Sequence, residues 1–119
     1  MIGYVTLGSN DLARARAFYD ALLGEVGIKR LMEFGERGTA WGVSMDKPAL
    51  GVMTPYDQRR ASAGNGTMVA LVVDSKDKVN RLHAKALALG GQDEGAPGPR
   101  GEGFYAAYFR DLDGNKLNA

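Results

Sequence analysis

The sequence contains no cysteine and a single histidine among its 119 residues. Without cysteine, the chain has neither a disulfide framework nor a zinc site built on thiolates. The one histidine, His83, falls in the middle of a predicted helix, beside the apolar Leu82. No motif pairs it with a nucleophile and an orienting group, so we interpret it as a residue at the edge of the core rather than a catalyst.

A bias toward either charge and a long apolar run are also absent. Lys and Arg number 15 and Asp and Glu number 14, which leaves a formal net charge of +1. The densest basic spot, Arg59-Arg60, lacks the extent of the basic patch that is typical of nucleic-acid-binding proteins. No apolar stretch approaches the roughly 20 residues of a membrane helix, and residues 1–10 carry no signal-peptide pattern. We therefore expect a cytoplasmic protein that binds neither nucleic acid nor membrane.

What the sequence does contain is one pattern used twice. In its first occurrence, the spacing of apolar and β-branched residues predicts a strand, a helix and three strands, at residues 2–7, 11–23, 29–36, 39–45 and 49–54. Ser9, Asn10 and Asp11 are candidate caps for the start of that helix. The polar, glycine-containing segment that follows is interpreted as a linker.

The second occurrence begins after this linker. Its pattern predicts strands at residues 67–73, 104–110 and 116–119. After the first of them, Val79, Leu82, Ala86 and Leu89 form the apolar stripe of a predicted helix, which ends at Gly90-Gly91. Asp74 and Ser75 are the candidate helix caps, and Asp113-Gly114 predicts a hairpin turn. The intervening residues 92–103 are rich in glycine and proline and predict a short strand at most.

A chain of this length fits one compact domain. The predicted class is α+β, with two βαβββ modules that form a cupped mixed β-sheet and carry their helices on the outer face. Module one covers residues 1–54, the linker 55–66 and module two 67–119. Because side chains alternate along a strand, one set should face the helices: Val5, Leu7, Val69, Leu71 and Val73. The set that should face the opposite side comprises Tyr4, Thr6, Met68, Ala70 and Val72.

Two segments near the ends of the chain carry a resemblance to a known family. Tyr4-Val5-Thr6-Leu7, Asn10-Asp11-Leu12 and Ala17-Phe18-Tyr19 resemble the opening strand and helix of vicinal oxygen chelate proteins, the superfamily of glyoxalases, bleomycin-resistance proteins and ring-cleaving dioxygenases. Residues 109–115, FRDLDGN, resemble the closing hairpin of these proteins, with Leu112 where proline is usual. The resemblance covers nearly the whole chain. It implies modules that pair within one chain or between two, and therefore a homodimer.

The resemblance also concerns metal. Metal-dependent relatives use a His on the first strand, a His or Glu on the fifth and a Glu on the last, and glyoxalases add a Glu on the last strand of module one. The matching positions here are Tyr4, Met68 and Asn118, and residues 51–53 contain no carboxylate or imidazole. A neutral phenol, a thioether and an amide do not replace the anionic or imidazole ligands of divalent metals. The implied protein is a member that has no metal and no other cofactor, and Tyr4 and Met68 should approach each other across the cup floor.

Eight residues are predicted to bind a ligand in this cup: Tyr4, Thr6, Trp41, Met53, Met68, Tyr108, Arg110 and Asn118. Apolar and aromatic groups with a few polar ones are typical of small-molecule sites. Other interpretations stay open: the large side chains fill the cup, Trp41 packs against the other module, and Arg110 is a solvated surface charge. The remaining loop arginines, Arg37 among them, are each interpreted as solvent exposed. The loop at 95–103 lacks the ending of a phosphate-binding loop and is expected to be flexible.

The leading functional hypothesis is binding of a small, mostly apolar or aromatic molecule without metal, as the resemblance implies. The first alternative is an enzyme of the same superfamily that works without metal, with Tyr4 or Tyr108 as acid or hydrogen-bond donor. The second alternative is a dimeric interaction module with a filled cup. A well-formed cavity with a convergent Tyr, Thr and Asn would favour the first two hypotheses over the third.

Overall fold

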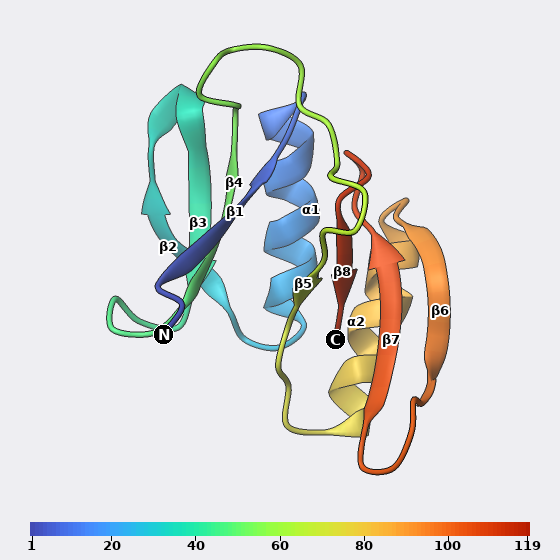
Figure 1. The fold of residues 1–119 in the computed structure, drawn as a ribbon. Helices are drawn as coiled ribbons and strands as arrows, with labels where there is room; N and C mark the ends of the chain where they lie inside the picture. The colour runs from blue at the N-terminus through green and yellow to red at the C-terminus, as the bar shows by residue number, and fades with distance from the viewer.

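Two βαβββ units lie side by side in the computed structural model, which describes residues 1–119 (Figure 1). The first unit contains β1 (Tyr4–Gly8), α1 (Leu12–Gly24), β2 (Lys29–Glu33), the 3-10 helix η1 (Gly35–Arg37), β3 (Gly38–Gly42) and β4 (Ala49–Met53). The second contains β5 (Val69–Ala70), α2 (Lys76–Ala88), β6 (Gln92–Pro99), β7 (Tyr105–Arg110) and β8 (Lys116–Asn118). The α+β class predicted from the sequence is confirmed.

The two sheets have the same topology. Their strand orders are β1-β4-β3-β2 and β5-β8-β7-β6. In each sheet the first strand pairs in parallel with the last strand of its unit, and the other pairs are antiparallel. The mixed sheets arise because the helix after the first strand carries the chain across the sheet, whereas short loops join the remaining strands. Neither helix has the length and apolarity that spanning a bilayer requires.

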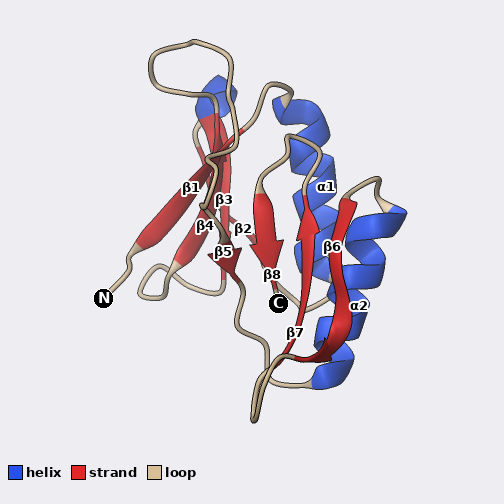
Figure 2. Ribbon diagram, turned by 45° about the vertical axis from the view of Figure 1, so that its right-hand side comes forward, coloured by secondary structure: helices blue, strands red, loops and turns tan.

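One apolar core joins the two units. Helices α1 and α2 contact each other, and Figure 2 shows them together on one side of the strands. The core combines side chains from α1, from both sheets and from α2, including Phe18, Leu22, Trp41, Val52, Leu82, Phe109 and Leu117. Leu7 is buried in it, and Val5, Val69, Leu71 and Val73 pack against it, as strand alternation predicts. The opposite set is open to solvent: Tyr4 is 72% exposed, Met68 43% and Val72 97%.

Both helices begin at a predicted cap. The Asp11 side chain accepts a hydrogen bond from the Arg14 backbone N–H at 3.0 Å, and the Ser75 hydroxyl accepts one from the Lys78 N–H at 3.2 Å. Each cap satisfies a backbone donor that the first helical turn leaves without an intrahelical partner.

Several strand lengths differ from the prediction. The strands predicted at 29–36 and 39–45 end earlier, at Glu33 and Gly42, and the largest differences are in the second unit. β6 is a full eight-residue strand, where the glycine and proline content predicted a short strand at most. It is an edge strand, and its pairing with β7 is interrupted by two register shifts between Asp93 and Gly98. Glycine and proline are tolerated at such irregularities and edges. Conversely, β5 has only two residues, because its sole neighbour is the three-residue β8.

The two segments that carry the family resemblance meet in the interior. The Tyr19 hydroxyl on α1 donates to Asp111 Oδ2 at 2.6 Å, and Asn115 Nδ2 donates to the same oxygen at 2.9 Å. Asn115 Nδ2 also donates to the Gly8 carbonyl at the end of β1, at 2.9 Å. Asp111 Oδ1 accepts the backbone N–H groups of Asp113 and Asn115. This Tyr19–Asp111–Asn115 network therefore ties the β7–β8 turn to the first unit.

Candidate functional site

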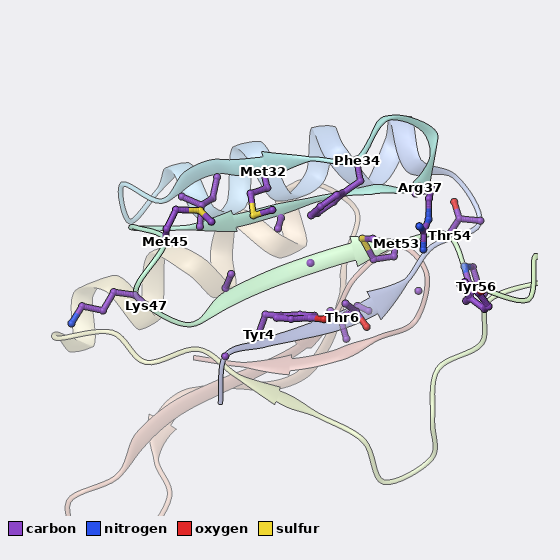
Figure 3. Close-up of a pocket in the computed structure, with 18 residues that line it drawn as sticks. Tyr4, Thr6, Met32, Phe34, Arg37, Met45, Lys47, Met53, Thr54 and Tyr56 are labelled. Atoms are coloured by element: carbon purple, nitrogen blue, oxygen red, sulfur yellow. The ribbon is translucent and has the colours of Figure 1, made fainter. Parts of the chain in front are cut away.

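A cleft of about 780 Å³ lies on the sheet β1-β4-β3-β2 (Figure 3). Figure 3 shows the strands between the cleft and α1, so the cleft occupies the face that points away from the core. Small residues on β3 and β4 form its floor, namely Ala40, Ala49 and Gly51. Because these side chains are short, the curved sheet leaves a hollow where larger residues would fill it. The cup of this unit is therefore open, which argues against a filled cup.

The walls of the cleft are apolar and adaptable. They include three methionines and three aromatic residues: Met32, Met45, Met53, Tyr4, Phe34 and Tyr56. These side chains come from five parts of the first unit and the linker. They are β1, β2 with the residue after it, the β3–β4 loop, the end of β4 and the start of the linker. Methionine is flexible and polarizable and makes favourable contacts with aromatic rings. Exposed apolar groups gathered in a concave site indicate a binding surface.

Only two charged side chains line this cleft, and both are cationic. Arg37 lies in η1 and Lys47 in the β3–β4 loop, and no Asp, Glu or His is among the lining residues. Neither Arg37 nor Lys47 forms an ion pair within the chain. The Arg37 guanidinium lies 5.8 Å from the centroid of the Tyr56 ring. The cleft is thus an apolar hollow with positive charge at its margin.

Three of the predicted ligand-binding residues, Tyr4, Thr6 and Met53, line this cleft. Trp41 does not, and the placement predicted for it is wrong. It is 1% exposed in the core, and its indole N–H donates to Asp20 Oδ1 at 2.9 Å. Side chains alternate along β3, and the neighbouring Ala40 is the residue that faces the cleft. The prediction identified the strand but assigned its large residue to the wrong face.

The other four predicted residues, Met68, Tyr108, Arg110 and Asn118, belong to the second unit. The cleft is lined only by residues between Gly3 and Tyr56, so none of the four contributes to it. The expected approach of Tyr4 and Met68 across one floor is therefore not found within the chain. The physical reason is that the two units pack on each other through their helices and shared core, which leaves the opposite faces of the two sheets as separate surfaces.

These four residues have local partners of their own. Tyr108 pairs with Asn118 in the sheet, and its ring lies 5.4 Å from the Arg100 guanidinium and 5.6 Å from the Lys116 ammonium. Arg110 forms an ion pair with Glu94 and donates to the Gly114 carbonyl at 2.8 Å. Asn118 is 3% exposed. Arg110 thus has an internal acid as its partner.

The residues at the three family ligand positions do not fit a metal ion. Tyr4 lies in the cleft, whereas Met68 and Asn118 lie outside it, and the three donors are a phenol, a thioether and an amide. Divalent transition metals require imidazole, carboxylate or thiolate ligands. No group of three or more His, Asp or Glu side chains elsewhere in the chain could hold a metal ion.

His83 has a partner but lies outside the cleft. It is 7% exposed on α2, and its Nε2 lies 2.9 Å from Asp93 Oδ1 at the start of β6. Hydrogen bonds from His83, and then from the Gly95 N–H, lower the pKa of Asp93. The pair joins a helix to an edge strand.

Several cleft residues were missed from the sequence: Met32, Phe34, Arg37, Met45, Lys47 and Tyr56. A usable signal existed for some of them. Met32 and Phe34 are apolar, and their spacing places them on the same face of a predicted strand whose other residues are mostly charged. Tyr56 is an aromatic residue in a polar linker. Arg37 carried no such signal, because a charged residue in a turn is ordinarily solvated.

Comparisons with known proteins agree with this architecture. A family model described as glyoxalase/bleomycin resistance protein/dioxygenase superfamily matches residues 1–119. A glyoxalase/bleomycin resistance protein from Albidiferax ferrireducens T118 is 36% identical, with a TM-score of 0.91 over 100% of this chain and 96% of that one. No curated protein matches the sequence.

Two more distant structures share the fold. A lactoylglutathione lyase from Agrobacterium tumefaciens is 20% identical, with a TM-score of 0.71 over 99% of this chain and 90% of that one. A glyoxalase/bleomycin resistance protein/dioxygenase family enzyme from Burkholderia phytofirmans PsJN is 20% identical, with a TM-score of 0.76 over 98% of this chain and 94% of that one.

Proposed function

The chain belongs to the glyoxalase/bleomycin resistance protein/dioxygenase superfamily, and from that premise we propose that it binds a small, mostly apolar or aromatic molecule without a metal ion. The binding site is the cleft on β1-β4-β3-β2. The observation that carries the proposal is the lining of this cleft, which combines methionine and aromatic walls with a floor of small residues. We also propose that the chain forms a homodimer.

The volume of the cleft suits this class of ligand. Sites for small molecules measure roughly 300–1,000 Å³, and the cleft measures about 780 Å³. A bicyclic aromatic molecule that loses about 200 Å² of apolar surface gains on the order of 5 kcal/mol from its burial. Lost translational and rotational freedom offsets part of this gain. Micromolar to millimolar dissociation constants are therefore the expected range for simple aromatic probes.

The donor set supports binding without a metal. The phenol of Tyr4 lies in the cleft, and no carboxylate or imidazole accompanies it. A divalent ion placed there would exchange strongly bound water for weak neutral ligands. We assign no metal-assisted step to this cleft for that reason.

The proposal is tested with N-phenyl-1-naphthylamine, a neutral aromatic probe that fluoresces in apolar surroundings. We expect saturable binding of one probe per chain. Gly51→Leu should weaken it at least tenfold, since a Cβ at position 51 makes only ordinary contacts, the nearest at 3.4 Å to Thr6, and the added side chain fills the hollow. Val72→Ala, at a 97% exposed position outside the cleft, is the matched control and should bind normally.

Two further results would contradict the proposal. Probe binding that Gly51→Leu leaves unchanged would place the site elsewhere. Stoichiometric metal in the purified protein, with probe binding that a chelator abolishes, would contradict the metal-free part.

A further inference from the structure

The cleft carries positive charge that nothing in the chain neutralises. Four of the other arginines, Arg14, Arg30, Arg81 and Arg110, each form an ion pair with an Asp or Glu. Arg37 has no such partner, and its side chain forms no hydrogen bond within the protein. No acidic residue lines the cleft. An anion is therefore the species whose charge would complement this site.

The backbone of Arg37 is held firmly at one end of the cleft. Its N–H donates to the Phe34 carbonyl at 3.1 Å, and its carbonyl accepts the Thr54 N–H at 2.8 Å. From α1, Arg16 donates to the Gly35 carbonyl and, at 3.3 Å, to the Gly38 carbonyl, so it braces the turn on both sides of Arg37. Because the backbone is already fixed, only the side chain of Arg37 loses conformational entropy when a ligand is bound.

The charged and apolar parts of the cleft are arranged along its length. Figure 3 shows the Arg37 side chain beside Met53, Thr54 and Tyr56 at one end. Met32 and Tyr4 lie nearer the middle, and Lys47 lies at the other end with its ammonium directed outward (Figure 3). A molecule with an apolar body and one anionic end would match this order.

We propose that the ligand is an amphiphilic organic monoanion whose carboxylate binds the guanidinium of Arg37 and whose apolar or aromatic body lies against Met32, Phe34 and Met53. The proposal rests on the proposed function and adds the ligand's charge and orientation to it. A guanidinium presents parallel N–H donors that match the two oxygens of a carboxylate. Arg37, rather than Lys47, is the partner because its side chain lies among other lining residues, whereas the Lys47 ammonium is directed to solvent.

The test compares two molecules of the same shape, 1-naphthaleneacetate and its neutral amide, 1-naphthaleneacetamide. Each competes with N-phenyl-1-naphthylamine for the cleft. We expect the carboxylate to displace the probe at a concentration at least tenfold lower than the amide requires. Arg37→Gln should reduce this ratio to below about twofold and leave the affinities of the probe and the amide unchanged. Because the Arg37 side chain forms no ion pair or hydrogen bond within the chain and lies only beside the exposed Tyr56 ring, this variant should nearly keep the melting temperature of the parent.

Two control variants sharpen the assignment. Arg60→Gln removes a loop arginine that does not line the cleft and should keep the full carboxylate preference. Arg37→Lys keeps the charge but loses the planar fork, and it should keep only part of the preference.

The outcomes separate this inference from the proposed function. If the probe binds but the carboxylate and the amide displace it equally, the inference is overturned and the proposed function stands. A carboxylate preference that survives Arg37→Gln and disappears in Lys47→Gln would also overturn it. Failure of the probe to bind at all would remove both.

Discussion

The hydroxyl of Tyr19 donates to one buried carboxylate. Tyr19 is 1% exposed and Asp111 5% exposed, and their oxygens are 2.6 Å apart. Burial, and then the negative charge of Asp111, raise the pKa of Tyr19 well above its ordinary value. The phenol therefore stays protonated in the folded protein at a pH where the unfolded chain ionises. Its contribution to stability is present below about pH 10, the unfolded pKa, and is lost as the pH rises through the folded pKa.

Tyr19→Phe tests this account. It keeps the ring and leaves Asp111 with one donor fewer, so we expect the free energy of unfolding to fall by about 1–3 kcal/mol at pH 7. The difference between the parent and the variant should shrink above pH 10, as measured by urea unfolding. Tyr105→Phe, which removes a surface hydrogen bond to Asn80, is the control and should cost less than about 0.5 kcal/mol. If the two variants lose the same free energy of unfolding, the buried hydrogen bond of Tyr19 stabilises the protein no more than the exposed one of Tyr105.

The orientation of a single side chain was the hardest property to predict from the sequence. The sequence predicted the strand that contains Trp41. It did not show which face of that strand packs against the helix, because both faces carry apolar residues. Trp41 was assigned to the cup, whereas packing against Tyr19 at 5.5 Å and the bond to Asp20 hold it in the core. Tyr4 and Thr6 lie on the face opposite Val5 and Leu7, because the apolar residues of β1 alternate clearly; their part in ligand binding stays a prediction.

Elements could be predicted where local chemistry determines them. The caps Asp11 and Ser75 could be identified because each side chain bonds to a backbone N–H only three positions further along the chain. Strand length instead depends on a partner far along the chain. β6 extends to Pro99 because β7 lies beside it, and β5 stops after two residues because β8 is short. The prediction that Tyr4 and Met68 share one cup failed for the same reason, because no local sequence pattern determines how the two modules pack.

Asp20 links one helix to two strands and supports a prediction at this scale. It accepts two hydrogen bonds from Arg30 on β2 and one from Trp41 on β3. Hydrogen bonding from Arg30, with a smaller contribution from Trp41, lowers the pKa of Asp20. The Asp20 contribution is therefore present above its unfolded pKa of about 3.9 and is lost as the pH falls through the lower folded value.

Asp20→Ala should destabilise the protein by about 1–3 kcal/mol at pH 7, mainly because the buried indole N–H of Trp41 loses its acceptor. The exposed ion pair adds little to this loss. Chemical unfolding followed by the fluorescence of the single tryptophan measures both effects, and the penalty should diminish as the pH falls below the unfolded pKa of about 3.9. Asp77→Ala, which breaks an exposed pair with Arg81 on α2, is the control and should cost under about 0.5 kcal/mol. If the two variants behave alike, Asp20 contributes only as a surface charge.

At the scale of the whole molecule, the chain leaves large apolar side chains in water. Tyr4, Val43, Met45, Tyr56 and Val72 are each more than half exposed. A surface of this kind is typical of a protein that buries it against a partner or a ligand.

We expect a homodimer that buries at least about 1,200 Å² in total, the lower end of stable interfaces. The single chain has a radius of gyration of 13.8 Å over its Cα atoms. A compact particle of twice the length should have one of about 17–18 Å by the usual size scaling. Small-angle scattering, with sedimentation at micromolar concentration, distinguishes the two sizes. A monomer in both measurements would contradict the homodimer, and the exposed apolar faces would then be covered only by a ligand.

The Tyr19–Asp111–Asn115 network also bears on the order in which the molecule is assembled. The two oxygens at its centre come from residues that are 92 positions apart in the sequence. Contacts of such separation form late, because a long loop must close before they contribute. The Tyr19→Phe variant should accordingly unfold faster while refolding at nearly the parental rate. During synthesis, α1 leaves the ribosome long before the β7–β8 turn that accepts the Tyr19 hydrogen bond. The core of the first module should therefore stay incomplete until the second module has been synthesised.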